Sequence, residues 1–396
     1  MKRSVAHLPL HGGQAPAWLF QRMHRLAGSI VQLIVIDAGP VEMLARLADP
    51  FWFQAFGCVL GFDWHSSGLT TVTCGALKEA YKRLGDEFGI HVAGGKGGVS
   101  RKTPTEIQTV GDRTGLDADR LVYASKMSAK VDSAAVQDGY ELYHHNFFFD
   151  ETGRWCVVQQ GMCDANGYAR RYHWLETIVP GGTASADDGS RTSGRGGSRT
   201  APEGETDATP SSPGHVESFV CEPHSAILTQ ERVDRQLMLN LVAAEAEGSR
   251  TGSVEVARMH PDALLDELDD APSLFMPAHH PVLPSDVNPK WLAKTLRGVY
   301  EDPPTDFEGL LAMRGIGAKT VRSLALIAEV IYGQAASRRD PATFSLAHGG
   351  KDGHPYPVDR DLYDRNIALL ERAVARAKVS PKEKDDALRR LERLTR

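Results

Sequence analysis

Polar side chains recur between the aromatic residues of the N-terminal half. Because a polar side chain near a hydrophobic core is unfavourable, its position there indicates a structural or functional role. Six of them are of the types that metal-dependent hydrolytic sites use: Asp63, His65, Lys130, Asp132, His145 and Gln159. Carboxylates and imidazoles bind one or two divalent ions that activate water, and a lysine can steady a pentacovalent phosphate. The set predicts a phosphodiester-cleaving site, with Mg²⁺ or Mn²⁺ bound by Asp63, His65, Asp132 and His145. The competing interpretation is that each is a hydrogen-bonded core residue.

Two strands are expected to position part of this set. Residues 140–149 and 154–160 have the amino-acid composition of β-strands, and the Asp-Glu-Thr-Gly sequence between them is typical of a β-hairpin turn. Because alternate side chains of a strand lie on opposite faces, Tyr143 is expected on the side of His145, with His144 on the other side. We therefore predict an antiparallel β-hairpin within an α+β domain.

A glycine-rich run, AGGKGGVSRKT at 93–103, offers successive backbone amides together with Lys96, Arg101 and Lys102. Such a run could bind phosphate. It matches neither the P-loop nor the dinucleotide-binding glycine pattern, which argues against an ATP site. We interpret it as a substrate loop, with a plain glycine turn as the alternative.

A second candidate site lies at 307–333, FEGLLAMRGIGAKTVRSLALIAEVIYG, where one apolar helix stops at a Gly-Ile-Gly turn and another begins. The segment resembles a helix-hairpin-helix DNA-binding motif. Gly315 and Gly317 are expected to give the turn its backbone freedom, with Ile316 pointing inward. An ordinary helix pair joined by a glycine turn is the alternative.

The amides at the start of the second helix, biased positive by the peptide dipoles, would bind backbone phosphates. The residues expected to contact DNA are Arg314, Gly315, Gly317, Lys319, Thr320 and Arg322. Contacts of this kind carry little sequence information, so we expect non-sequence-specific binding with a marked salt dependence.

A Gly/Pro-rich loop at 348–365 follows this segment and contains Asp359. The order is similar to that of base-excision DNA glycosylases, a resemblance that implies Lys319 as a Schiff-base nucleophile and Asp359 as the carboxylate assisting departure of the base. A desolvated lysine amine suits such an attack. The alternative role for Asp359 is capping the helix that follows it.

The chain has 396 residues, 41% hydrophobic and 24% charged, as in ordinary globular proteins with two or three domains. We predict an α+β catalytic domain at 1–179, a disordered Gly/Ser-rich linker or insert at 180–215, and an all-α domain at 216–396 with the helix-hairpin-helix at 307–333. The net charge is −6, yet residues 291–396 hold 19 Lys and Arg against 15 Asp and Glu. Basic character therefore coincides with the helix-hairpin-helix segment.

Helical patterns account for most of the C-terminal half. They cover residues 229–246, 261–268, 289–300 and 365–394, besides the helix-hairpin-helix segment. Pro381 is a typical helix-starting residue, so the last pattern predicts two helices that are separated just before it.

No apolar run approaches the length of a membrane span, and no signal core follows the basic N-terminus. This indicates a cytoplasmic protein without a membrane partner. The five cysteines lack a C-x-x-C spacing, which argues against a disulfide framework or a zinc ribbon. A homo-oligomer is compatible with the sequence.

Five segments together carry a wider resemblance: LPLHGGQAPAWLF, DPFWFQAFGCVLGFDWHSSG, YASKMSAKVDSAAVQDGYELYHHNFF, GYARRYHWL and AHGGKDGHPYPVDR. They resemble the prokaryotic family called domain of unknown function 763. The resemblance implies that the two halves belong together, and it supplies no reaction.

Three functional hypotheses follow. The leading one is a metal-dependent, repair-type nuclease that acts on single-stranded, junction or damaged DNA held by the helix-hairpin-helix. The second is a base-excision glycosylase or lyase that uses Lys319 and Asp359 without a metal. The third is a non-catalytic DNA-binding module that recruits a partner.

Overall fold

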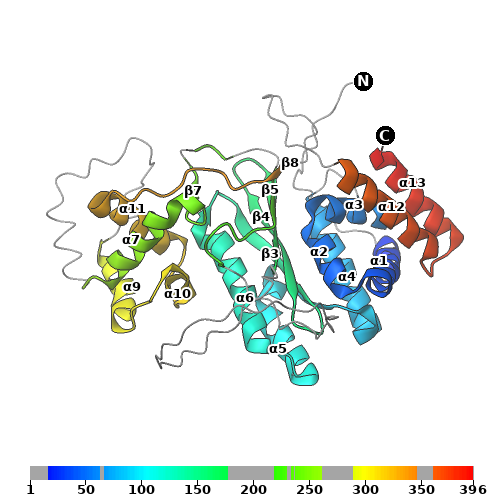
Figure 1. Cartoon of the computed structure of the whole chain (residues 1–396), viewed down its shortest axis with the longest axis horizontal. Helices are drawn as coiled ribbons and strands as arrows, with labels where there is room; N and C mark the ends of the chain where they lie inside the picture. The colour runs from blue at the N-terminus through cyan, green and yellow to red at the C-terminus, as the bar shows by residue number, and fades with distance from the viewer. Residues whose placement is uncertain are drawn as a thin grey trace, which may run out of the picture.

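A six-stranded sheet separates two layers of helices (Figure 1). The computed structural model describes residues 17–62, 67–176, 218–229, 233–235, 237–260, 289–345 and 360–395. The strand order is β1-β3-β4-β5-β6-β8, antiparallel except for the β6–β8 pair, and β2 pairs separately with β7. The strands are β1 (His91–Lys96), β2 (Val136–Gln137), β3 (Glu141–Phe149), β4 (Trp155–Cys163), β5 (Tyr168–Leu175), β6 (Ala226–Thr229), β7 (Leu239–Asn240) and β8 (Phe344–Ser345).

The helices divide between the two faces of the sheet. One layer consists of α1 (Ala17–Ala38), α2 (Pro40–Ala48), α3 (Pro50–Leu60), α4 (Gly68–Leu84), α12 (Arg360–Arg376) and α13 (Pro381–Thr395). The other face carries α5 (Thr103–Thr114) and α6 (Ala118–Lys130), and beyond α6 lie α7 (Glu247–Arg258), α9 (Pro289–Glu301), α10 (Phe307–Ala312) and α11 (Ala318–Tyr332). Shorter helical turns are η1 (Gly85–Phe88), η2 (Gly97–Lys102), η3 (Val131–Ala135) and η4 (Ala244–Ala246). None of the helices in the described ranges is long and apolar enough to cross a membrane.

The β3–β4 hairpin confirms the predicted pair of strands. Asp150 holds the turn, because its Oδ1 accepts hydrogen bonds from the amides of Thr152 and Arg154 at 2.9 and 3.0 Å. Alternation along β3 then places Phe147 in the core shared with α6, and Phe148 in the core shared with α1 to α4. Both faces of this hairpin are therefore covered.

The C-terminal half is mostly helical, as expected, but it is not all-α. Ala226–Thr229 pairs with β5 as strand β6, and Phe344–Ser345 adds β8 beside it. No α-helix forms in the described part of 229–246, where Leu239–Asn240 pairs with β2 instead. Strand β7 lies within the segment predicted to be helical and is buried where it pairs with β2, so tertiary pairing there outweighs local helical propensity. The helix predicted at 261–268 and the linker or insert predicted at 180–215 lie outside the described residues.

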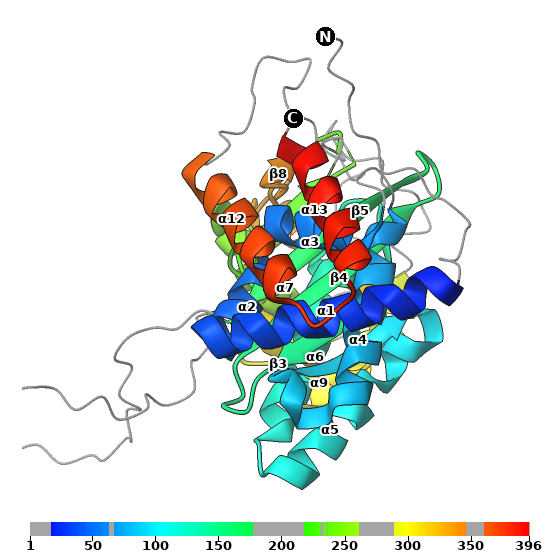
Figure 2. The same ribbon diagram turned by 90° about the vertical axis from the view of Figure 1, so that its right-hand side faces the viewer.

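The last two helices pack on the N-terminal helices. Figure 2 shows α12 and α13 in front of the sheet, beside α1. They contact α1 and α3 and bury Leu370, Val374 and Leu391 in the same core. The predicted break before α13 is confirmed. Ser380 and Glu383 form a capping box there: the Glu383 carboxylate accepts from the Ser380 amide at 3.0 Å, and the Ser380 hydroxyl accepts from the Glu383 amide at 3.4 Å. The second half of the chain thus contributes to both helical layers and to the sheet.

Candidate functional site

The first polar cluster lies between the sheet and α6. His145 on β3 and Gln159 on β4 are register partners, and the Nδ1 of His145 bonds the Oε1 of Gln159 at 2.8 Å. The other ring nitrogen of His145, Nε2, bonds the hydroxyl of Ser125 on α6 at 2.9 Å. The histidine therefore bridges the sheet and the helix with both of its nitrogens.

Asp132, in the turn η3, completes the first cluster. Its carboxylate accepts hydrogen bonds from the side-chain amide of Gln159 and from Trp174 Nε1, the latter at 2.9 Å. The Nε2 of His224 bonds the other carboxylate oxygen. His224 was not among the predicted site residues, because it follows the Gly/Ser-rich stretch as an isolated histidine and carries no spacing signal.

The structure thus joins three of the six residues predicted for catalysis, Asp132, His145 and Gln159. Both nitrogens of His145 are hydrogen-bonded, and burial lowers the pKa of this residue. Within the described ranges, no three His, Cys, Asp or Glu side chains are grouped so that they could hold a metal ion. Divalent-metal binding stays a prediction, and this arrangement leaves His145 no free nitrogen for it.

The other predicted catalytic residues are placed differently. Asp63 and His65 lie outside the described residues. Lys130 ends α6, half-buried, and desolvation lowers its pKa. It donates none of the hydrogen bonds described above for Asp132.

A second cluster runs across the opposite face of the sheet. The register aligns Lys96 with His144, His144 with Gln160, and Gln160 with Arg171. Directly opposed residues of antiparallel strands share a face, so these four side chains form one row. We call it the Lys96–Arg171 row.

A β-bulge at Tyr143 adds a fifth side chain to this row. The register shifts between Leu142 and His144, so two residues of β3 oppose one residue of β4. The Tyr143 hydroxyl accepts a hydrogen bond from Gln160 Nε2, and its ring centre lies 5.7 Å from the Lys96 ammonium. The expectation that Tyr143 lies on the other side from His144 is therefore wrong, because the bulge turns Tyr143 toward Gln160.

The glycine-rich run at 93–103 spans the end of β1 and the turn η2. Its own side chains close the turn: the Ser100 hydroxyl donates to the carbonyl oxygen of Gly97, and the Thr103 hydroxyl donates to that of Ser100, both at 2.6 Å. Arg101 and Lys102 are exposed. The run thus forms an ordered turn at the Lys96 end of the row.

A buried ion-pair cluster fastens the segment after α11 to the sheet. Arg170 on β5 binds Asp138 at 3.0 Å and Asp340 at 2.8 Å, and the hydroxyl of Tyr172 donates to Asp138 at 2.7 Å. Burial lowers the pKa of Arg170, but the two carboxylates outweigh that effect and raise it. Both carboxylates of this cluster are paired with the guanidinium inside the protein, which fits a structural role.

The turn between α10 and α11 has the sharp geometry expected from its glycines, with one correction. Gly315 has φ +90°, a conformation that favours glycine. Gly317 has φ −125° and ψ −174°, which any residue can adopt, so it is not needed for backbone freedom. Ile316 between them is fully buried, as predicted.

The residues predicted to contact DNA divide into two groups. Arg314, Gly315 and Lys319 are exposed at the turn and on the first turn of α11. Thr320 is only 1% exposed, and Arg322 Nε donates to a side chain of the protein, Gln137, at 2.7 Å. Asp359, the other residue of the lyase hypothesis, lies outside the described residues.

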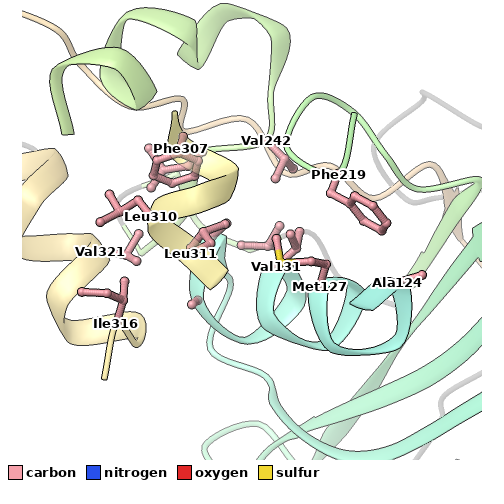
Figure 3. Close-up of a cluster of buried hydrophobic side chains, with 14 of the residues drawn as sticks. Ala124, Met127, Val131, Phe219, Val242, Phe307, Leu310, Leu311, Ile316 and Val321 are labelled. Atoms are coloured by element: carbon pink, nitrogen blue, oxygen red, sulfur yellow. The ribbon is translucent and has the colours of Figure 1, made fainter. Parts of the chain in front are cut away.

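The α10–α11 pair packs beside α6 through apolar side chains. Figure 3 shows Leu311 of α10 directed toward Met127 of α6 and Val131 just after it, with Leu310 and Val321 in the same cluster. All five side chains are at most 2% exposed. The turn is therefore held on the layer of helices that packs on the sheet.

Comparison with known proteins gives one match. The sequence profile of a family described as "Protein of unknown function (DUF763)" matches residues 4–189 and 211–358. The chain belongs to this family. In this DUF763 protein the unmatched stretch at 190–210 falls within the linker or insert predicted at 180–215, and α12 and α13 follow the last matched residue. No curated protein and no solved structure matches the chain.

Proposed function

We propose that this DUF763 protein binds the DNA backbone, without sequence specificity, through the turn between α10 and α11. The observation that carries the proposal is an exposed cationic turn on a buried apolar frame. Arg314 and Lys319 are exposed, whereas Leu310, Leu311 and Ile316 beneath them are fully buried.

The start of α11 suits a phosphate group. Gly317 caps the helix without a side-chain hydrogen bond, and α11 runs for 15 residues to Tyr332. The amides of a helix start point outward and carry a partial positive charge. Lys319 and Arg314 add full charges near those amides, and an anionic backbone is the partner that this combination favours.

The anchoring of the turn also supports the proposal. Gln137, at the end of β2, donates from Nε2 to the carbonyl oxygen of Ala318 at 2.8 Å, and its Oε1 accepts from Arg322. The first turn of α11 is thus tied to β2 by one side chain. A fixed turn loses less conformational entropy when it binds a phosphate than a loose one does.

The geometry favours binding over lyase chemistry at this turn. Desolvation is one way in which a lysine is activated to form a Schiff base. Lys319 is exposed on the first turn of α11, so its amine is not desolvated there. Nuclease activity of the N-terminal half stays a hypothesis, and the binding experiment tests it together with the lyase.

The experiment incubates the full chain with labelled single-stranded, duplex, junction and abasic DNA, in Mg²⁺ or Mn²⁺ and separately in EDTA. We expect retarded complexes with several unrelated sequences in both buffers, and Arg314→Gln should weaken all of them alike. DNA fragments that form only in the presence of metal would support nuclease activity in addition to binding. A covalent complex with abasic DNA that borohydride traps would support lyase activity. Absence of any complex at low salt would refute the proposed function.

A further inference from the structure

The Lys96–Arg171 row contains polar groups that none of the described residues satisfies. His144 is 2% exposed, and neither of its ring nitrogens has a hydrogen-bond partner among the described residues. The Oε1 of Gln160, fully buried next to it, also lacks one in that part of the chain. Buried polar groups are nearly always hydrogen-bonded, so unpaired ones at neighbouring positions need an explanation.

The charge of the row is positive, and no carboxylate of the described residues pairs with it. Arg171 is 1% exposed, and its guanidinium donates to neutral acceptors only, which are Gln54, Thr70, His173 and the carbonyl oxygen of Pro50 among the described residues. Burial lowers the pKa of Arg171 to about 9, which still leaves it protonated at neutral pH. Lys96 at the other end is exposed and forms none of the ion pairs found between described residues.

The backbone around these groups is irregular in the way that binding sites often are. The bulge in β3 brings the Tyr143 hydroxyl to Gln160, and the neighbouring strand β1 carries Gly94 and Gly95 with φ of +95° and +150°. A Cβ at Gly94 would lie 2.2 Å from the carbonyl oxygen of His145, so only glycine fits there. Gly94 thus lets the backbone of β1 approach that of β3 closely beside the row.

An anion fits this combination better than a cation does. Burial lowers the pKa of His144 to about 3, with the charges of His145 and Lys96 acting in the same direction, so its imidazole is neutral and offers one N–H. The positive charges at both ends of the row disfavour a metal ion. The carboxylate of Glu106, which accepts from the amide of Gly94, is itself paired with Lys78 at 2.7 Å.

We propose that the Lys96 end of the Lys96–Arg171 row is a binding site for a phosphate-class oxyanion, with His144, Lys96 and Tyr143 as its donors. The oxyanion would accept a hydrogen bond from the unpaired N–H of His144 and neutralise the charge of Lys96. Its source is either a small phosphorylated ligand or a phosphodiester of nucleic acid. The proposal is independent of DNA binding at the α10–α11 turn.

Thermal unfolding of the full chain in inorganic phosphate, against chloride at equal ionic strength, tests the proposal. We expect phosphate to raise Tm with a saturating dose response. Lys96→Gln should weaken the apparent affinity about tenfold, because it removes a charge-assisted contact. Lys382→Gln, which changes an exposed lysine on α13, should leave the affinity unchanged.

His144→Phe provides the second variant, since it keeps an aromatic ring and removes both unpaired nitrogens. It should raise Tm in chloride and abolish the response to phosphate. Arg314→Gln should leave the part of the phosphate response that depends on Lys96 unchanged, so failure here and failure at the α10–α11 turn are distinguishable.

The source of the oxyanion is identified by competition in the Arg314→Gln, Lys319→Gln double variant, in which the α10–α11 turn has lost its exposed cations. A single-stranded oligonucleotide that displaces phosphate from this variant would support the site and identify nucleic acid as the source. Failure to displace a bound phosphate would support the site and identify a small ligand.

Two results would overturn the inference. One is a phosphate response of Tm that is no larger in the wild type than in Lys96→Gln and His144→Phe. The other is stabilisation by Zn²⁺ or Mn²⁺ that His144→Phe abolishes, which would make the row a metal site.

Discussion

Gln137 and Arg322 join the two halves of the chain: the side-chain oxygen of Gln137, at the end of β2, accepts a hydrogen bond from Arg322 Nε at 2.7 Å. The same side chain donates to the carbonyl oxygen of Ala318 at 2.8 Å. The first turn of α11 is thereby fixed to β2. This glutamine therefore adds polar contacts to the apolar packing that holds the proposed DNA-binding turn.

Gln137→Ala should loosen the α10–α11 turn without dissolving its apolar frame. We expect a loss of about 1–3 kcal/mol in the free energy of unfolding, because the hydrogen bonds of Gln137 to Ala134, Ala318 and Arg322 are removed. Amide hydrogen exchange should rise in α11 and stay unchanged in the β3–β4 hairpin. Equal protection of α11 in both proteins would show that the apolar contacts alone fix the turn.

The two glycines of the turn should differ in their tolerance of a side chain. A Cβ would meet no heavy atom within 4 Å at either Gly315 or Gly317, so sterics do not separate them. Only Gly315 has a positive φ, and Gly315→Ala should cost about 1–2 kcal/mol. Gly317→Ala is the matched control and should change the free energy of unfolding by less than about 1 kcal/mol. Urea unfolding of both variants measures the difference, and equal costs would argue against the described turn.

Arg170→Met should be strongly destabilising. It leaves Asp138 and Asp340 without their cation in a buried site, for which about 3–5 kcal/mol is typical. Arg339, whose side chain is 57% exposed and pairs with Glu222 and Glu245, provides the comparison. Arg339→Met should cost less than about 1 kcal/mol, because solvent screens exposed ion pairs. Similar losses in both variants would contradict the structural role given to Arg170.

His144 should make the protein less stable in mild acid. Its usual pKa is 6.5, and burial lowers the pKa to about 3 in the folded chain, so protons bind the unfolded chain first. The free energy of unfolding should therefore fall as the pH drops from 6.5 toward 3, by up to about 1.4 kcal/mol per pH unit for this group. Urea unfolding between about pH 7 and pH 5 should show a shallower pH dependence in His144→Phe than in the wild type. Identical slopes would mean that His144 is not buried and neutral.

Local patterns in the sequence were sufficient for elements whose signals are short-range. The turn residues at 150–153 predicted the β3–β4 hairpin, and Pro381 predicted the break between α12 and α13. The Gly-Ile-Gly turn likewise predicted the burial of Ile316. Each of these signals acts within a few residues, where hydrogen bonding and sterics decide the outcome.

Contacts between residues far apart in the sequence could not be predicted from these local patterns. Residues 226–229 become a strand because β5 offers an open edge, and nothing within that segment specifies the partner. His224 approaches Asp132 from 92 positions away, and the bulge at Tyr143 reverses the side predicted by simple alternation. His145 and Gln159 were chosen by residue type, but only tertiary structure shows that they bond one another.

The most direct test of the central claim is the salt dependence of DNA binding by the full chain. Affinity for a random-sequence duplex should fall linearly on a double-logarithmic plot against salt concentration, and each lost phosphate contact should lower the slope by about 0.9. The double variant Arg314→Gln, Lys319→Gln should therefore bind more weakly and with a smaller slope, whereas Lys382→Gln should match the wild type. If the double variant keeps the wild-type affinity and slope, the turn between α10 and α11 is not the DNA-binding surface.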